Sequence, residues 1–124
     1  MTVAVTNNPL AVERLGAMGM RARFVESGCM GVYLAARDMI HLGHRLVTHP
    51  LAGSVAPGRA PYRTILLESA GGPPDAAELS MIEEGIRACA EAGPGPAGGE
   101  WGEGALADFR LIDCDLALGP PPRG

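Results

Sequence analysis

The alternation of apolar and polar positions predicts strands and helices that follow one another from the start of the chain. Residues 2–6 are a β-branched run with an apolar interior, which is typical of a central strand. Asn8 followed by Pro9 suits the N-cap and the first position of a helix over residues 10–17. Residues 20–26 alternate, with apolar side chains on one face and two arginines on the other, and this pattern predicts a second strand.

The same kind of pattern continues through the rest of the chain. Residues 30–42 are predicted to form a helix that ends at a glycine, and residues 45–48 a short strand. Residues 62–68 carry the strongest strand pattern, and residues 75–92 open with a capping box and form the clearest helix. Residues 105–118 are predicted to be a short helix or strand. The residues expected to lie in the core are Leu34, Ile40, Ile65, Leu79, Ile82, Ile86 and Cys89.

This order of elements predicts an α/β fold, in a single small three-layer domain over residues 1–118 with a mostly parallel sheet and helices on its faces. The first and fourth strands are expected to lie inside the sheet. Residues 49–61 contain three prolines and two glycines, which indicates an ordered loop or an open hairpin connection. Residues 93–104 are predicted to be a mobile Gly/Pro-rich segment, and residues 119–124 a frayed tail.

Composition excludes several classes of protein. With 124 residues, 47% of them apolar, the chain is long enough to bury one core without disulfides. Its three cysteines contain no C-x-x-C pair, which argues against a disulfide framework and favours a reducing, cytoplasmic compartment. No apolar run approaches the ~20 residues of a membrane span, and the first residues lack the basic flank of a secretory signal. Aromatic residues make up only 4%, so nucleic acid is not an expected partner.

The charges are divided unevenly between the two halves of the chain. Residues 1–63 hold seven arginines and three acids, a net charge of +4, whereas residues 64–124 hold three arginines and eleven acids, a net charge of −8. The first half is therefore expected to attract anions. The long helix contributes four of the acids: Glu78, Glu83, Glu84 and Glu91. They are expected to form a solvated face, with contact to a partner or to a second copy of the chain as the alternative.

Polar residues follow the predicted strands at their carboxyl ends, where α/β proteins bind ligands. Asn7 and Asn8 stand at a helix N-terminus, whose N–H groups and dipole suit a carboxylate or a phosphate. Simple capping of the helix explains the same two residues. We expect the loop that follows the third strand to lie beside them, so that both segments form one pocket.

That loop offers an imidazole, hydroxyls, exposed backbone amides and guanidiniums within sixteen residues, which is the inventory of an anion site. The residues proposed to bind the anion are Thr48, His49, Gly53, Ser54, Arg59 and Arg63. The alternative is that the hydroxyls satisfy the loop backbone while the arginines are solvated. Arg63 is the weakest member, because strand alternation can direct its side chain away from the pocket.

Two residues are candidates for catalysis. His49 is a candidate acid or base, because imidazole titrates near neutral pH, although no serine, cysteine or acid stands at the spacing of a triad. Cys29, expected at the start of a helix, is a candidate reactive thiol, with burial in the core as the alternative. The three histidines predict no metal site, because a glycine is expected to end the helix between the first two. No cofactor is expected, since the chain has neither a Walker-type loop nor G-x-G-x-x-G after the first strand.

Three motifs stand out: Thr-Asn-Asn-Pro at 6–9, Gly-His-x-Leu-x-Thr-His-Pro-Leu-x-Gly-Ser at 43–54 with Pro-Tyr at 61–62 behind it, and Asp-Phe-x-Leu-Ile-Asp at 108–113. Together they resemble the GrdX family of small proteins, which are encoded beside glycine, sarcosine and betaine reductase genes. The resemblance implies a cytoplasmic protein of anaerobic amino-acid metabolism, and it supplies no catalytic residue or cofactor.

The leading functional hypothesis is a non-enzymatic accessory or ligand-sensing protein of a glycine-reductase-type system, which binds a small anionic metabolite or a reductase subunit. The alternative is a small transferase or hydrolase that acts on a phosphorylated or carboxylated substrate with His49 as the acid or base. The missing phosphate-loop motifs and the missing nucleophile pair favour the first hypothesis.

Overall fold

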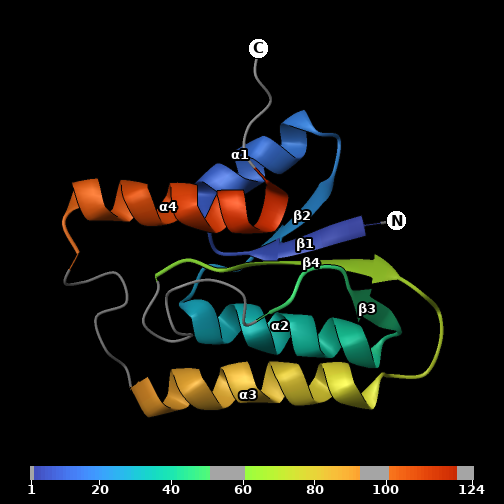
Figure 1. Cartoon of the computed structure of the whole chain (residues 1–124). Coiled ribbons are helices and arrows are strands. Elements are labelled where there is room, and N and C mark those ends of the chain that lie inside the picture. The colour runs from blue at the N-terminus through green and yellow to red at the C-terminus, as the bar shows by residue number, and fades with distance from the viewer. Residues whose placement is uncertain (1, 51–60, 93–100, 120–124) are drawn as a thin grey trace.

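A central sheet is covered by helices on both faces. The computed structural model describes residues 2–50, 61–92 and 101–119, and all statements below concern these residues. Helices α1 and α4 lie on one face of the sheet, whereas α2 lies on the other face with α3 packed along it (Figure 1). The layered α/β arrangement is therefore confirmed. The elements are β1 (Thr2–Thr6), α1 (Pro9–Ala17), β2 (Arg21–Phe24), α2 (Cys29–His41), β3 (His44–Leu46), β4 (Thr64–Ser69), α3 (Ala76–Ala92) and α4 (Glu103–Leu118).

The sheet is mixed, with the strand order β2-β1-β4-β3. β1 is parallel to β2, but β4 is antiparallel to both β1 and β3. The prediction of a mostly parallel sheet is therefore wrong. A parallel neighbour needs a long crossover that usually contains a helix, and the Pro/Gly-rich residues between β3 and β4 carry no helix pattern, so the chain returns in the opposite direction. β1 and β4 do lie inside the sheet, as predicted.

The direction of β4 decides which residues meet at one end of the sheet. Because β4 is antiparallel to both neighbours, the carboxyl ends of β1 and β3 share an edge with the amino end of β4. The register of β1 and β4 pairs Thr6 with Thr64 at this edge. Residues that follow β1 and β3 and residues that precede β4 are thus brought together.

Strand alternation divides the core into two clusters, one on each face of the sheet. Ile40, Ile65, Ile82 and Cys89 are buried in the cluster on the α2 side, and Leu79 and Ile86 pack against it while partly buried. Leu34 is only partly buried. The cluster on the α1 and α4 side consists of Ala4, Ala11, Leu15, Leu66 and Cys114. The predicted apolar stripe of α3 therefore faces the core.

Several local features were also predicted from the sequence. The Asn8 side chain caps α1 by accepting a hydrogen bond from the Leu10 N–H, with Pro9 at the first helical position. Asp75 caps α3, because its carboxylate accepts from the Glu78 N–H at 3.0 Å. β2 is shorter than predicted and exposed at all four residues, because it lies at the edge of the sheet. Residues 105–118 are helical, within α4.

The acidic face predicted on α3 needs a correction at one position. Glu83, Glu84 and Glu91 are exposed as expected, but Glu78 is buried, with 9% of its surface exposed. Its carboxylate accepts from the Arg45 Nε–H at 3.0 Å and from the Leu46 N–H at 2.8 Å. Glu78 therefore joins α3 to the edge strand β3. In the described part of the chain, no helix is long and apolar enough to cross a membrane.

Candidate functional site

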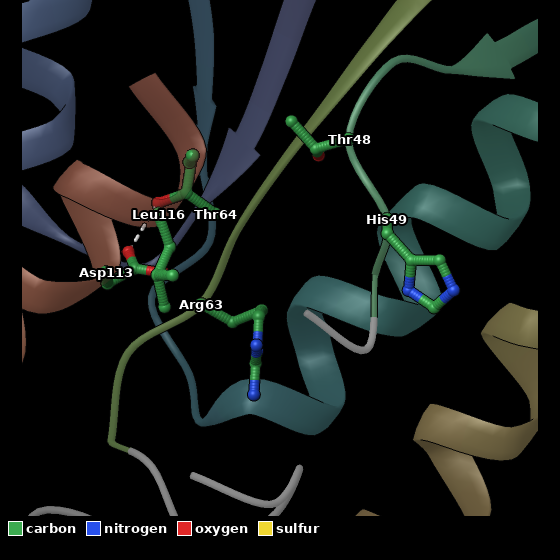
Figure 2. A pocket seen from close by; sticks show the side chains of 7 residues that line it. Thr48, His49, Arg63, Thr64, Asp113 and Leu116 are labelled. Carbon is green, nitrogen blue, oxygen red and sulfur yellow. Dashed lines mark hydrogen bonds between the residues drawn. The ribbon is translucent and has the colours of Figure 1, made fainter. Parts of the chain in front are cut away.

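A cavity of about 60 Å³ opens at the sheet edge where β1 and β3 end and β4 begins. Three segments far apart in the sequence line it (Figure 2). Its described lining consists of Thr48 and His49 after β3, Arg63 and Thr64 at the start of β4, and Asp113, Leu116 and Ala117 from α4. The cavity has room for a few water molecules or one small metabolite.

A chain of hydrogen bonds ends on the buried acid of this cavity. Asp113 is 7% exposed, and its Oδ2 accepts from the Thr64 hydroxyl at 2.6 Å and from the Asn8 Nδ2 at 3.0 Å. The Thr64 hydroxyl oxygen lies 2.7 Å from that of Thr6, which in turn accepts from the Asn8 N–H at 3.0 Å. Because the only hydroxyl proton of Thr64 goes to Asp113, Thr6 donates to Thr64.

The surroundings of Asp113 act on its pKa in opposite directions. Burial away from water raises the pKa, since it disfavours the charged form. Hydrogen bonds from Thr64 and Asn8 and the positive charge of Arg63 offset part of this rise. The net result is a pKa above the ordinary value of an aspartate.

Arg63 places a buried cation on the wall of the same cavity. Arg63 is 7% exposed, and its guanidinium carbon lies 5.9 Å from the centroid of the Tyr33 ring, which makes a cation–π contact. The Tyr33 hydroxyl donates to the Pro50 carbonyl at 2.7 Å, so the same ring also holds the segment that carries His49. A Cβ at Gly85 would lie 2.6 Å from the Tyr33 ring, which explains why α3 carries a glycine there.

Comparison with known families identifies the chain. The family model of the GrdX-like protein matches residues 3–119. The chain belongs to the GrdX-like family. No curated protein and no solved structure matches it.

The three motifs that carry the GrdX-like resemblance meet around the cavity. Asn8 of the first motif contacts Asp113 of the third, and Thr48 and His49 of the second line the cavity beside Asp113. The structure thus brings the first and third motifs into direct contact over a separation of more than one hundred residues. Gly53, Ser54 and Arg59, which belong to the predicted anion site, lie outside the described residues.

Asn7 and Asn8 do not line the cavity, but they hold residues that do. The Asn7 Nδ2 donates to the Ser27 and Pro61 carbonyls, both at 3.0 Å, and its Oδ1 accepts from the Arg63 N–H at 2.9 Å. The Asn8 side chain caps α1 and donates to Asp113 and to the Arg110 carbonyl. Capping therefore accounts for Asn8, and Asn7 fixes the start of β4.

The remaining candidates occupy different environments. The Thr48 hydroxyl accepts from the Leu66 N–H at 3.0 Å, so it satisfies the sheet edge as well as lining the cavity. His49 is exposed, and its ring lies on the opposite side of the cavity from Asp113 (Figure 2). Cys29 is buried, and burial raises its pKa to about 12, which disfavours a reactive thiolate. Among the described residues no group of three His, Cys, Asp or Glu is placed to hold a metal ion.

Sequence reasoning missed Asp113 as a site residue, together with Thr64, Leu116 and Ala117. The signal available was the Asp-Phe-x-Leu-Ile-Asp motif at 108–113, which ends on this acid. That signal could not be used, because residues 105–118 fitted either a helix or a strand and the buried face differs between the two.

Proposed function

We propose that this GrdX-like protein is a non-catalytic accessory of a glycine-reductase-type system that binds a small metabolite in the cavity through the metabolite's anionic group. The observation that carries the proposal is Arg63, a cationic residue that is 7% exposed and lines the cavity. A guanidinium on the wall of a cavity can bind a ligand carboxylate or phosphate through charge-assisted hydrogen bonds.

The chemistry of guanidinium fits this role. It presents several N–H donors in one plane, so Arg63 can keep its contact with Tyr33 and still direct donors toward an anion. The backbone of Arg63 is fixed by its N–H bond to Asn7, which limits the conformational entropy lost on binding. The link to a reductase system rests on membership of the family.

The geometry supports binding better than catalysis. Acid–base catalysis by His49 with Asp113 as its orienting acid needs the two side chains within hydrogen-bond reach of each other. His49 and Asp113 lie on opposite sides of the cavity (Figure 2). The described part of the lining contains no serine or cysteine.

Calorimetric titration with acetate, glycolate and inorganic phosphate tests the proposal. We expect Arg63→Gln to weaken binding of the preferred anion by about 1–3 kcal/mol, or roughly 5- to 150-fold, through lost charge-assisted hydrogen bonds. Arg23→Gln, on the exposed edge strand β2, is the matched control and should bind as the wild type does. Unchanged affinity in Arg63→Gln, or no binding of any anion by the wild type, would contradict the proposal.

A second variant tests the proposal independently, in case Arg63→Gln does not fold. Ala117→Leu fills the cavity without changing its charge and should also abolish binding, whereas Ala90→Leu on the exposed face of α3 should not. A product assay with acetyl phosphate separates binding from catalysis. Turnover by the wild type that His49→Ala abolishes would instead support the hydrolase or transferase.

Contact with a reductase subunit is a second candidate function, and one surface favours it. α4 exposes three large apolar side chains, Leu111, Ile112 and Leu116, at 50%, 45% and 51%. Exposed apolar clusters of this kind often mark protein contacts. Co-purification with a reductase subunit that Ile112→Glu abolishes, while anion affinity stays unchanged, would support this function.

A further inference from the structure

The cavity wall carries buried charges of both signs. Arg63 and Asp113 are each 7% exposed, and both line the same space. A ligand with only a negative charge is attracted by the first and repelled by the second, and such forces are strong where water is excluded. A ligand that carries both charges satisfies both walls.

We propose that the ligand is a small zwitterion, whose carboxylate contacts Arg63 and whose ammonium group contacts Asp113. This inference rests on the proposed function and specifies the class of its ligand. It is carried by the positions of the two buried charges and by the shape of the end of α4.

The hydrogen bonds of Asp113 in the described structure come from neutral groups. Both side-chain donors to this carboxylate, Thr64 and Asn8, bond to Oδ2. The carboxylate also accepts from the backbone N–H of Thr64, so the donors that the described residues give it are all neutral. Strand alternation directs Arg63 and Thr64 to opposite faces of the sheet, so a ligand that contacts both Arg63 and Asp113 lies across the start of β4 (Figure 2).

The end of α4 adds a second reason to place a cation near Asp113. Leu116 and Ala117, which line the cavity, belong to the last turn of a helix that ends at Leu118. Carbonyl groups of a last helical turn carry partial negative charge, which stabilises a nearby cation. The cavity of about 60 Å³ suits a small ligand. Glycine, the smallest amino acid, is the appropriate probe.

Three probes of similar size test the contributions of the two ligand charges one at a time. Glycine carries both, glycolate replaces the ammonium with a hydroxyl, and ethanolamine lacks the carboxylate. In calorimetric titrations of the wild type we expect glycine to bind at least about tenfold more tightly than glycolate, and ethanolamine to bind most weakly. Equal affinity for glycine and glycolate, both lost in Arg63→Gln, would overturn the zwitterion and leave the proposed function intact. No binding of either would overturn both.

Asp113→Asn tests the acid directly. Asparagine keeps the shape of the side chain, and its single oxygen can still accept from Thr64 and Asn8. We expect the variant to lose about tenfold or more in glycine affinity while glycolate binds equally well or better. Asp108→Asn, an exposed acid on the same helix, should change neither. If Asp113→Asn does not fold, the affinities of the wild type for glycine and glycolate still test whether the ligand is a zwitterion. Undiminished preference for glycine in a folded Asp113→Asn protein would overturn the assignment of Asp113.

Discussion

Glu78 and Asp113 are the two buried acids among the described residues, at 9% and 7% exposure, and they are held in different ways. Glu78 accepts from the charged guanidinium of Arg45 and from a backbone N–H of β3. Asp113 accepts from a neutral hydroxyl, a neutral amide and the backbone N–H of Thr64, on the wall of a cavity that it shares with Arg63. The first acid is compensated within the fold, whereas the charge of the second can act on a ligand.

The two acids also differ in what they do for the sheet. Glu78 bonds a backbone N–H of the edge strand β3, and such bonds protect an edge from pairing with other chains. Asp113 joins α4 to the ends of β1 and β4 through Asn8 and Thr64. Glu78 thus bonds directly to a cation, whereas the donors to Asp113 are neutral and Asp113 is the one of the two that lines the cavity.

The largest effect on stability is expected for Asn8→Ala. The substitution removes the cap of α1 and one donor to the buried Asp113, so we expect a loss of about 2–4 kcal/mol in the free energy of unfolding, measured by urea denaturation. Asn8→Ser keeps a capping oxygen and should recover only the capping part. A serine variant as stable as the wild type would show that the bond to Asp113 contributes nothing.

A smaller loss is expected for Glu78→Ala, about 1–3 kcal/mol, because the Leu46 N–H and the Arg45 Nε–H lose their acceptor, while Arg45 keeps its pair with Asp75. Glu83→Ala is the matched control on the same helix. Its pair with Arg37 is largely exposed, so its removal should cost at most about 1 kcal/mol. Equal losses in the two variants would show that the buried hydrogen bonds of Glu78 stabilise the fold no more than the exposed pair of Glu83 does.

The pH dependence of stability shows whether the fold favours the protonated or the charged form of Asp113. Its pKa is raised in the folded state, so the stability due to its protonated form is fully present below the unfolded value of about 3.9 and is lost as pH rises through the folded pKa. Asp113→Asn lacks this loss. Its stability relative to the wild type should therefore increase between pH 3 and pH 7 in urea denaturation, by less than the losses above. A relative stability that instead falls with pH would show that the charged form of Asp113 is favoured in the fold.

Local elements could be predicted from the sequence because short-range interactions determine them. Asn8 with Pro9 starts α1, Asp75 starts α3, and the apolar run around Ile65 forms a central strand. The direction of β4 was predicted wrongly from the alternation of strands and helices, although the missing helix pattern between β3 and β4 favours an antiparallel return. The pattern of apolar positions is the same in both directions.

The candidate site was only partly visible in the sequence. Thr48 and His49 were identified at the end of a predicted strand, and Arg63 was identified because it offers a guanidinium after the loop that follows them. Strand alternation made Arg63 the weakest of them, yet the cavity lies at the end of β4, where Arg63 and Thr64 both reach it from opposite faces. Asp113 depends on the rotation of α4 about its axis, which tertiary packing determines.

A titration of ¹⁵N-labelled protein with glycine, followed by amide chemical shifts, tests most directly whether the edge cavity is a ligand site. Glycine presents a carboxylate to Arg63 whether or not Asp113 recognises its ammonium group. We expect saturable shifts that are largest at Thr48, Arg63, Thr64 and Ala117, and that disappear in Ala117→Leu. Shifts that do not saturate, or that centre on another surface such as α3, would contradict a ligand site at this end of the sheet.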